Sequence, residues 1–591
     1  MYKDMGCGEI SVSDVGKRVN LAGWVFRRRD HGGLIFIDLR DRSGIIQVVF
    51  SPEVSAEAHS LAHDLRAEYV VSISGMLRKR PEGTENPHIP TGDIEVYADT
   101  LQLLNKCAPL PFPMEEAEDA SEYLRLKYRY LDLRRPEAQS RLILRHMAAK
   151  YIRDFLDSRA FVEIETPMLT KSTPEGARDF LVPSRLNPGT FYALPQSPQI
   201  FKQILMVAGL ERYYQIVRCF RDEDLRADRQ PEFTQVDIEM SFVNAHDVMA
   251  NTEELLRGLF GELLGIEFDG PFQRLSYSEA LSRFGTDKPD MRFGLELSDV
   301  SDLVNNSPFK VFLDALQAGG VVKAISGKGM AGLSRKEIDM LTQETQSYGA
   351  KGLAWIRLKG GFDSPIVKFF PEGLLRTIAD RLGAEEGDLM MFVADQQDTA
   401  NAVLSRLRNE LGKRLGLIKG GYSFVWITDF PLLEWNDEEG RFEAMHHPFT
   451  SPIDTDIERL LSGITDKHED LRSLKAKAYD IVLNGYEIGG GSIRIHRPEV
   501  QAKVFEVLGI SKQEAEDKFG FLLEALNFGA PPHGGIALGF DRLVMLMAGV
   551  QSIRDVIAFP KTQKGQCLLS GAPSEAQQRQ LRELYIKSTA H

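Results

Sequence analysis

Two short segments, about three hundred residues apart, each place an arginine where a phosphate-bearing ligand would need one. In residues 220–239, Arg221 precedes three acidic residues, a basic loop and an alternating, strand-like run. This pattern predicts a hairpin that carries charge on one face. In residues 534–543, glycines that let the backbone approach a ligand come directly before Arg542, at the start of an apolar helix. Either pattern alone also fits a solvated hairpin or an ordinary helix start.

Taken together and in this order, the two segments resemble motifs 2 and 3 of the class II aminoacyl-tRNA synthetases. Motif 1 of that class is a long helix followed by a strand that ends in proline. Residues 140–159 have the spacing of an amphipathic helix, and FVEIETPML with Pro167 follows them. Three motifs in order with matched spacing favour the resemblance over three unrelated elements.

The class activates a carboxylic acid with ATP, which crowds negative charge at the α-phosphate and calls for cations rather than a protein nucleophile. The planar guanidinium of Arg221 suits a phosphate oxygen together with the incoming carboxylate. Arg542 suits stacking on adenine, with Gly539 admitting the nucleotide. The predicted catalytic residues are Arg221, Glu223 and Arg542, and the predicted ATP-binding residues are Arg221, Asp222, Glu223, Gln230, Glu487, Gly539, Phe540, Asp541 and Arg542.

Asp480 and Glu487 stand seven residues apart in a strand-like run beside a glycine-rich stretch. Acidic residues in a strand are usually surface residues. Two carboxylates that face a triphosphate suit Mg²⁺, however, which binds one or two carboxylates together with phosphates. We therefore expect these two residues to be the metal ligands and Mg²⁺ to be the cofactor.

The amino acid that is activated can be inferred from charge. Lys202 in LPQSPQIFKQ and Arg494 in IGGGSIRIH are two cations aimed at a pocket that already holds an α-carboxylate, so they imply a second carboxylate on the substrate. Neutral asparagine would leave them unpaired. His446 is the ligand of the pair His446 and His447 by resemblance to the family. The predicted aspartate-binding residues are Glu175, Ser197, Gln199, Lys202, Arg221, Asp237, His446 and Arg494.

The elements that must carry these residues fall into several segments. Residues 17–104 alternate apolar and polar positions in five short runs, with one helical stretch near residues 57–65 after the third run. This order is that of an OB barrel, which binds oligonucleotides. Arg29, Phe36 and Gln47 suit base edges, stacking or phosphates and match the anticodon positions of the family. The alternative for Phe36 is plain barrel core.

The fold class expected is a multidomain α+β chain with an N-terminal OB-fold β-barrel, an antiparallel-sheet catalytic domain of the class II type and an inserted α/β domain. A proline-rich segment follows the barrel, and helices and strands without a catalytic constellation separate motif 2 from motif 3. The predicted boundaries are 1–106 for the barrel, 107–120 for the linker, 121–287 with 421–591 for the catalytic domain, and 288–420 for the insertion.

The bulk properties suit a cytoplasmic enzyme. A chain of 591 residues is too long for one core, no apolar run approaches a membrane span, and the start has no signal-peptide core. Four scattered cysteines argue against a disulfide framework or a structural zinc site. The net charge of −14 would discourage nucleic-acid binding if it were spread evenly, but basic patches such as residues 27–29 and 78–80 are local.

The resemblance extends over essentially the whole chain and is to the bacterial-type aspartyl-tRNA synthetases. It implies ATP-dependent attachment of L-aspartate to tRNA(Asp) through an aspartyl-adenylate, and a homodimer that motif 1 joins across a two-fold axis. The asparaginyl and lysyl relatives share the motifs, but Lys202 with Arg494 and the large insertion speak against them. An inactive, synthetase-like RNA-binding protein is the alternative from another class, and the retained Arg221, Glu223 and Arg542 oppose it.

Two loop positions in the barrel predict that tRNA(Asn) is accepted as well. In the resembling family, a histidine followed by glycine in the first loop and a small residue in the second accompany relaxed tRNA choice; His31 and Gly83 match them here. The anticodons differ at one base, so a loose loop contact would not reject the second tRNA. The alternatives are turn residues without such a role, and a strictly discriminating enzyme.

Overall fold

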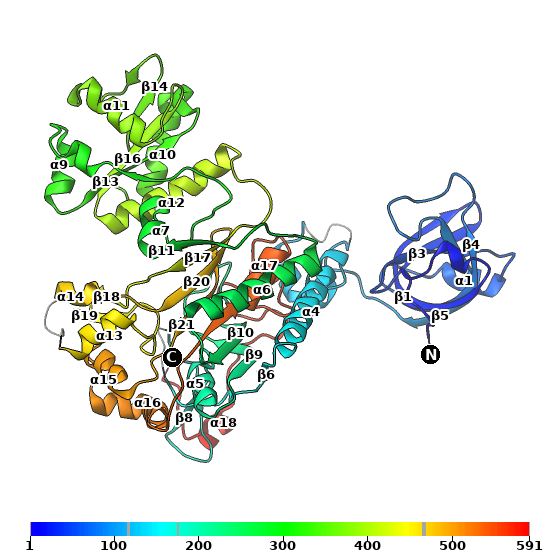
Figure 1. The fold of residues 1–591 in the computed structure, drawn as a ribbon. Coiled ribbons are helices and arrows are strands. Elements are labelled where there is room, and N and C mark those ends of the chain that lie inside the picture. The colour runs from blue at the N-terminus through cyan, green and yellow to red at the C-terminus, as the bar shows by residue number, and fades with distance from the viewer. Residues whose placement is uncertain (1, 115–118, 174–176, 464–467, 590–591) are drawn as a thin grey trace. The chain divides into compact units, whose positions relative to one another are not determined.

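The computed structural model describes residues 2–114, 119–173, 177–463 and 468–589 (Figure 1). The chain divides into two compact units. The first contains Met1–His146, Leu225–Asp228 and Val550–Glu575, and the second contains Met147–Asp224, Arg229–Gly549 and Ala576–His591. The domain boundaries predicted from the sequence stay a prediction.

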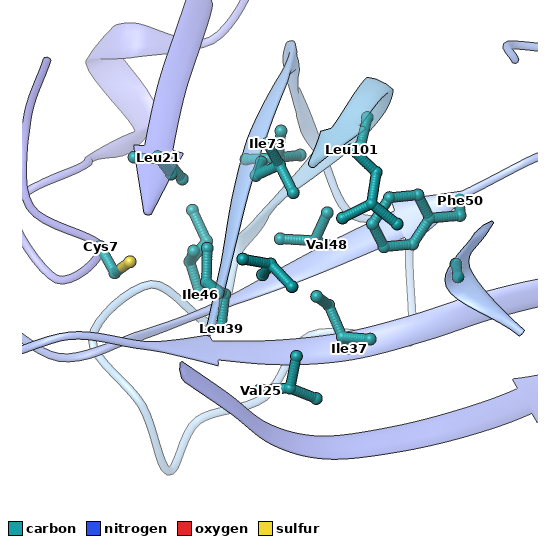
Figure 2. Close-up of a cluster of buried hydrophobic side chains, with 14 of the residues drawn as sticks. Cys7, Leu21, Val25, Ile37, Leu39, Ile46, Val48, Phe50, Ile73 and Leu101 are labelled. Atoms are coloured by element: carbon teal, nitrogen blue, oxygen red, sulfur yellow. The ribbon is translucent and has the colours of Figure 1, made fainter. Parts of the chain in front are cut away.

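The first unit begins with a closed five-stranded barrel in the order β1-β2-β3-β5-β4. Its elements are η1 (Val12–Asp14), β1 (Arg18–His31), β2 (Leu34–Arg40), β3 (Ile45–Phe50), α1 (Ala56–Ala62), β4 (Val70–Lys79) and β5 (Ile94–Asn105). Alternate residues such as Val25, Ile37 and Val48 fill the interior (Figure 2). The helix after the third strand and the closure confirm the predicted OB fold.

The rest of the first unit is a short helical block after the barrel. It contains α2 (Glu122–Lys127), α3 (Arg129–Asp132), the start of α4 (Pro136–Asp157) and η4 (Ile553–Asp555). Arg129 is buried, pairs with Asp132 at 2.5 Å and donates to the carbonyls of Arg554, Ile557 and Ala558. The amide of Ile553 in turn donates to the carbonyl of Ala227, which fixes that loop residue within the unit.

An eight-stranded sheet organises the second unit, in the order β11-β17-β20-β21-β22-β10-β9-β6. All neighbouring strands are antiparallel except the outer pairs β11–β17 and β6–β9. The strands are β6 (Val162–Glu163), β9 (Arg212–Phe220), β10 (Glu232–Ser241), β11 (Gln273–Ser276), β17 (Phe424–Thr428), β20 (Ala478–Leu483), β21 (Tyr486–Ile493) and β22 (His533–Gly539). The antiparallel sheet is the one predicted for the catalytic domain.

Helices and two small hairpins surround this sheet. The helices are α5 (Gln199–Val207), α6 (Ala245–Leu264), α7 (Tyr277–Phe284), α13 (Asp454–Leu461), α14 (His468–Arg472), α15 (Pro498–Val507), α16 (Lys512–Leu526), α17 (Phe540–Met547) and α18 (Gln578–Glu583). The hairpins are β7 (Leu181–Pro183) with β8 (Phe191–Ala193), and β18 (Leu433–Asn436) with β19 (Arg441–Ala444). The helix predicted at residues 140–159 is α4, shifted by a few residues.

The region of the two predicted metal ligands differs from the sequence expectation. The sequence predicts Asp480 and Glu487 in one strand-like run, but they lie on the neighbouring strands β20 and β21. Asn484 and Gly485, with φ of 53° and 87°, turn the chain between them. Asparagine and glycine tolerate positive φ, which makes this two-residue turn possible. The hairpin brings the two carboxylates together across strands rather than along one.

The inserted segment is a five-stranded antiparallel sheet in the order β12-β13-β16-β14-β15, covered by helices on both faces. Residues of β16 alternate, with Met391 in the core under α10 and α12 and Met390 in the core under α9 and α11. The elements are β12 (Ser298–Asp299), α8 (Ser301–Val304), α9 (Lys310–Gln317), β13 (Val321–Gly327), η2 (Met330–Gly332), α10 (Arg335–Ser347), β14 (Ala354–Leu358), β15 (Phe362–Asp363), η3 (Val367–Phe369), α11 (Glu372–Arg381), β16 (Leu389–Asp395) and α12 (Gln397–Arg414). This is the predicted α/β insertion.

Within the described part of the chain, no helix combines the length and the apolar character needed to cross a membrane.

Candidate active site

One row of paired residues across the central sheet joins the two acidic ends of the candidate site. Asp237 on β10 lies opposite Ala537 on β22, which lies opposite Gly490 on β21, which lies opposite Asp480 on β20. Directly paired residues point to the same face of a sheet, so two carboxylates face the same side with only small residues between them. Three strand spacings separate them by roughly 14 Å. This row of the sheet thus has an acidic group at each end, and we call it the sheet floor.

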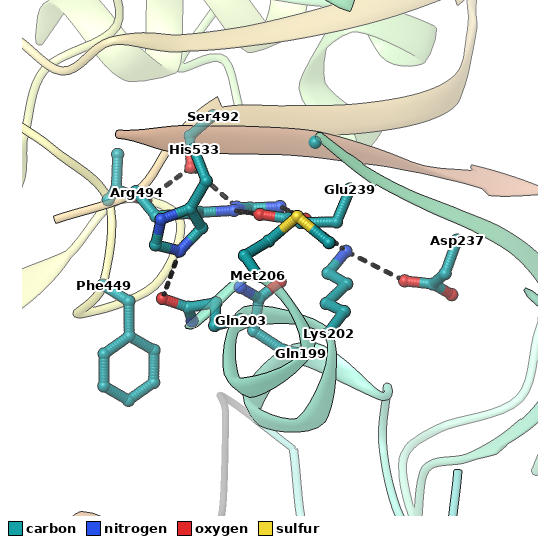
Figure 3. Close-up of polar contacts among 12 residues, drawn as sticks. Gln199, Lys202, Gln203, Met206, Asp237, Glu239, Phe449, Ser492, Arg494 and His533 are labelled. Carbon is teal, nitrogen blue, oxygen red and sulfur yellow. Dashed lines mark hydrogen bonds and ion pairs between the residues drawn. The ribbon is translucent and has the colours of Figure 1, made fainter. Parts of the chain in front are cut away.

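A buried cluster of charges occupies the β10 end of this floor (Figure 3). Lys202 extends from α5 and places its Nζ 3.0 Å from Asp237 Oδ1 and 3.4 Å from Glu239 Oε2. Arg494, just after β21, holds Glu239 with two hydrogen bonds of 2.9 and 3.1 Å. All four side chains are at most 3% exposed. The two predicted cations therefore meet carboxylates of the protein itself.

The pKa values of this cluster follow from burial opposed by pairing. Burial raises the pKa of Asp237, although Lys202 acts against it. Burial also acts to raise the pKa of Glu239, but Arg494 and Lys202 outweigh it and hold that pKa below its usual value. Burial, together with the neighbouring Arg494, lowers the pKa of His447 well below its usual value. The ring of His447 is thus neutral, and its Nε2 accepts a hydrogen bond of 2.6 Å from Arg494 Nη1.

A second cluster lies at the other end of the row. His446 Nε2 is 3.3 Å from Asp480 Oδ1, and Lys288 Nζ is 2.8 Å from Glu487 Oε2. A Cβ at Gly490 would come within 2.6 Å of Asp480 Oδ1, so the glycine leaves room for this carboxylate. Burial acts to lower the pKa of His446, but the contact with Asp480 outweighs it and raises that pKa. Burial raises the pKa of Asp480 in turn, against the effect of His446.

The two arginines predicted to contact ATP, Arg221 and Arg542, have different contacts in the structure. Arg221, which follows β9, has its guanidinium carbon 5.2 Å from the centroid of the Phe233 ring. Its Nε is buried and has no hydrogen-bond partner in the described parts of the chain. Arg542, on α17, donates from Nη1 to the backbone carbonyl of Glu487. Arg221 therefore has a donor to offer an anionic ligand, and Arg542 stands beside a predicted metal ligand.

Gly539, directly before α17, has room around it. A Cβ at this position would meet nothing closer than Ile488 O at 3.7 Å and Arg542 Cβ at 3.9 Å. Protein packing thus does not require glycine there. This leaves the close approach of a ligand, as predicted, as a reason for the missing side chain.

The remaining predicted ATP-binding residues have varied surroundings. Glu223 pairs with Arg229 at 3.1 Å, and Asp222 lies 3.9 Å from Arg178, on an exposed surface. Gln230 is 2% exposed. Asp541 accepts a hydrogen bond of 2.6 Å from the amide of Thr234, and Phe540 is 2% exposed in the core. The side chains of Asp541 and Phe540 thus support the fold, so a ligand could reach these two positions mainly through the backbone.

Two of the remaining predicted aspartate-binding residues, Ser197 and Gln199, lie at the start of α5, which also carries Lys202. Gln199, on the same helix as Lys202, is 5% exposed, and its Nε2 has no hydrogen-bond partner within the described ranges. The backbone N–H of Gln199 donates to Ser197 Oγ at 3.2 Å. Asp237 keeps one carboxylate oxygen, Oδ2, without a hydrogen-bond partner among the described residues. Glu175 lies outside the described residues.

The predicted anticodon residues share one outer face of the barrel. Arg29 lies opposite Phe36 in the β1–β2 register, and Arg29 Nη2 donates to Asp38 at 2.8 Å and to Gln47 at 3.2 Å. Gln47 donates to Glu95 at 2.7 Å. Phe36 is half-buried and lies between core residues in the alternation, so it faces outward, and the alternative that it is barrel core is wrong.

The two residues predicted to govern tRNA choice sit on exposed turns. His31 ends β1 and precedes Gly32 and Gly33, whose φ values are 59° and 80°. Gly83 has a φ of 84° and nothing within 4 Å of an added Cβ. A positive φ explains the glycine at this position without any ligand. The geometry is therefore compatible with both the functional and the turn interpretation.

Three residues of the site were not assigned from the sequence. Glu239 stands two residues after Asp237 on a strand, and the period of two could have placed both on the same face. His447 follows His446 directly, and adjacency alone could not show that Arg494 would hold its ring. Lys288 lies in the segment that opens the insertion. No sequence pattern predicts its role, because only the fold brings it close to Glu487.

Among the described residues, no group of three or more His, Cys, Asp or Glu side chains could hold a metal ion. Asp480 and Glu487 supply two carboxylates, which is the number that Mg²⁺ takes from a protein when phosphates complete its coordination. The donors therefore fit a divalent ion that binds together with ATP and do not form a protein cage for a resident metal.

Comparison with known proteins gives two family matches. Residues 121–563 match the model described as tRNA synthetases class II (D, K and N). Residues 19–104 match the OB-fold nucleic acid binding domain.

Curated relatives match along the whole chain. A protein named Aspartate--tRNA(Asp/Asn) ligase from Thermodesulfovibrio yellowstonii is 63% identical over 591 residues, covering 99% of this chain and 100% of that protein. Proteins of the same name from Persephonella marina and Aquifex aeolicus are 56% and 57% identical. The alignments cover 99% and 98% of this chain and 97% of each relative.

Solved structures share the fold at low identity. The asparaginyl-tRNA synthetase from Pyrococcus horikoshii complexed with asparaginyl-adenylate is similar with a TM-score of 0.59 and 21% identity, over 95% of this chain and 99% of that chain. The aspartyl tRNA synthetase from Entamoeba histolytica gives 0.56 and 19%, over 94% and 91%. At this identity the likeness shows the fold alone.

Proposed function

Because the chain belongs to the class II tRNA synthetases of the D, K and N group, we propose that it attaches L-aspartate to tRNA(Asp) and also to tRNA(Asn), through an aspartyl-adenylate. The full-length relatives at 56–63% identity carry the name Aspartate--tRNA(Asp/Asn) ligase. The observation in this chain that carries the proposal is the buried cluster of Lys202, Arg494 and their two carboxylates.

The cluster accounts for aspartate in spite of its balanced charge. Lys202 has three N–H donors, of which two face Asp237 and Glu239. Arg494 has five, of which four face Glu239, His447 and Ser492. Counting partners among the described residues, one donor remains on each of the two, and together these donors suit the two oxygens of a side-chain carboxylate. The side-chain NH₂ group of asparagine would face one of these N–H donors, and two donors facing each other disfavour asparagine.

The other groups of the substrate take the remaining positions. Oδ2 of Asp237 accepts from the substrate ammonium, Gln199 contributes its Nε2, and His446 acts from the Asp480 end of the row. Arg221 contacts the α-carboxylate and the α-phosphate with its unused Nε. An oxygen of the α-carboxylate then attacks the α-phosphorus and pyrophosphate leaves. Arg221 contributes because charge grows at this phosphate in the transition state.

ATP lies over the small residues of the sheet floor, with its adenine against Arg542 and its phosphates towards Asp480 and Glu487. Class II synthetases use ATP and typically a divalent metal; Mg²⁺ is the ion proposed here, held by these two carboxylates. The ion supplies charge neutralisation at the phosphates.

The proposed tRNA site is the outer face of the barrel, where Arg29, Phe36 and Gln47 meet the anticodon. Phe36 faces outward beside Arg29, which suits stacking of an unpaired base next to a cation. His31 and Gly83, on two loops of the barrel, are the residues proposed to allow both tRNA(Asp) and tRNA(Asn). The enzyme is proposed to work in the cytoplasm as a homodimer. An inactive RNA-binding protein has no observation in its favour.

The deciding experiment is aspartate-dependent exchange of pyrophosphate into ATP. The wild-type protein is expected to exchange with aspartate and not with asparagine. Arg221→Ala is expected to lose roughly a hundredfold or more in rate, the magnitude of losing one transition-state donor, with the fold retained. Exposed Arg185→Ala is the matched control. Exchange by Arg221→Ala at the wild-type rate would remove Arg221 from the mechanism, and no exchange by the wild type would refute the proposed function.

A further inference from the structure

Lys288 is a cation at the predicted metal site that belongs to none of the three motifs. Its Nζ lies 2.8 Å from Glu487 Oε2 and 3.9 Å from Asp287. The positive charges that the sequence predicted around ATP were Arg221 and Arg542. Lys288 adds a third, delivered by the segment that opens the insertion.

The backbone around Lys288 is anchored while its ammonium group stays accessible. Asp290 is 8% exposed, and its Oδ1 accepts from the amide and Nε of Arg292. The carbonyl of Asp290 accepts from Arg408, which is 1% exposed on α12. A Cβ at Gly485 would be 3.4 Å from Asp290 Cβ, so this segment lies against the turn between β20 and β21. The side chain of Lys288 nevertheless keeps 43% of its surface exposed.

An ordinary ion pair would not need this arrangement. A pair between exposed groups contributes little to stability, because water screens it and two long side chains lose freedom. Here a lysine is directed at a carboxylate that a triphosphate and its metal would otherwise use. Lysine is a compact point charge with rotatable donors, so it can change partners by turning its side chain.

We propose that Lys288 is a substrate-contacting residue of the adenylation reaction, which pairs with Glu487 in the free enzyme and moves to the β- and γ-phosphates when ATP binds. This inference rests on the proposed function and extends it. The movement frees Glu487 Oε2, so that Glu487 would be able to hold the metal that accompanies ATP. The insertion thereby contributes directly to the chemistry of the catalytic sheet.

In the adenylation reaction, negative charge grows on the leaving pyrophosphate, and Lys288 can stabilise it. A bond forms between a carboxylate oxygen of aspartate and the α-phosphorus, and the bond from that phosphorus to the bridging oxygen breaks. The electron pair stays on the bridging oxygen, so pyrophosphate leaves with one more negative charge than it shared in ATP. Lys288 at the outer phosphates stabilises this growing charge, while Arg221 acts at the α-phosphate.

The test compares two ligands whose responses to the loss of Lys288 have opposite signs. Lys288→Met removes the charge and keeps the length of the side chain. Binding of magnesium pyrophosphate, measured by calorimetry, is expected to weaken about tenfold or more, as for the loss of one charged hydrogen bond. Binding of Mn²⁺ alone, measured by electron paramagnetic resonance, is expected to tighten roughly fivefold, because a cation near the carboxylates has gone.

Two further variants sharpen the result. Lys288→Arg keeps the charge and is expected to stay within about threefold of the wild type for magnesium pyrophosphate. Lys419→Met removes an exposed lysine of the same insertion and is expected to change neither ligand. Exchange by the wild-type protein is measured in the same preparation, so that a failure of the proposed function is seen separately.

Two outcomes overturn the inference. If Lys288→Met binds magnesium pyrophosphate within twofold of the wild type, the ammonium does not contact the phosphates. If the variant weakens both Mn²⁺ and magnesium pyrophosphate, Lys288 supports the shape of the site and does not change partners. Opposite shifts, with rescue by arginine, establish it.

Discussion

Lys202 and Arg494 lie in a buried cluster in which each cation already has a carboxylate partner. The sequence places two cations in one pocket and predicts a carboxylate ligand for them. The structure supplies carboxylates from Asp237 and Glu239, so the cluster is balanced before any substrate enters. Selection then depends on the direction of the remaining N–H donors rather than on net charge. Buried groups with fixed directions discriminate strongly, because a wrong ligand leaves them unpaired.

The balance within this cluster predicts a coupling between Lys202 and Asp237. Lys202→Met leaves Asp237 as an uncompensated buried charge and is expected to lower the free energy of unfolding by about 3–5 kcal/mol. Adding Asp237→Asn removes the orphaned charge, so the double variant is expected to be more stable than the sum of the single effects. Urea unfolding of the four proteins measures the coupling. Additive single effects would show that the two buried charges do not stabilise each other.

The His446–Asp480 contact predicts a pH dependence of stability. The pKa of His446 is raised above its ordinary value of 6.5, so the protonated ring stabilises the folded protein. This contribution is complete below pH 6.5 and is lost as the pH rises through the folded-state pKa. His446→Gln should therefore be less stable than the wild type mainly at low pH, with the difference shrinking as the pH rises. Denaturant unfolding without metal or ATP measures it, and a pH-independent difference would contradict it.

At the scale of elements, the sheet explains what the sequence could and could not reveal. The OB barrel was predictable because apolar alternation and turn residues are local signals. The row from Asp237 to Asp480 was not, because it depends on the register of four strands that lie far apart in sequence. Lys288 was missed for the same physical reason. Its partner Glu487 lies about two hundred residues later in the chain.

The two adjacent glycines of β21 predict opposite results. A Cβ at Gly490 comes closest to the carboxylate of Asp480, which can turn away, whereas a Cβ at Gly491 lies 2.2 Å from the carbonyl oxygen of Gly535. Gly491→Ala is expected to destabilise the fold by about 1–3 kcal/mol or more, as an overpacked core does. Gly490→Ala is expected to cost less stability but to raise the KM for ATP, because Asp480 is displaced. Thermal unfolding and exchange kinetics distinguish them, and equal destabilisation would contradict the register.

At the scale of the whole molecule, the proposed homodimer predicts where two copies meet. Val162 lies on β6, the last strand of the sheet order, and is 47% exposed, and Leu169 just beyond it is 52% exposed. Exposed apolar side chains at a sheet edge are typical of an interface. Sedimentation at micromolar concentration is expected to show a dimer that Val162→Lys weakens. The control Leu186→Lys, at another exposed leucine, is expected to leave the dimer intact. A wild-type monomer would contradict the proposal.

The predicted acceptance of both tRNA(Asp) and tRNA(Asn) concerns the largest ligand of the molecule. Gly83 has a φ of 84° and open space around it, so this position of the loop offers no side chain that could reject a base. Asparagine tolerates positive φ and would add a hydrogen-bonding amide there. The wild type is expected to aspartylate purified tRNA(Asn) and tRNA(Asp) at rates within about tenfold of each other. Gly83→Asn is expected to change the free-energy difference between the two tRNAs by up to about 1–3 kcal/mol, the magnitude of one discriminating base contact. Glu85→Ala, in the same loop, is the control for a general disturbance. If the wild type prefers tRNA(Asp) by roughly a thousandfold, beyond what one such contact can supply, the enzyme is strictly discriminating and Gly83 is a turn glycine only.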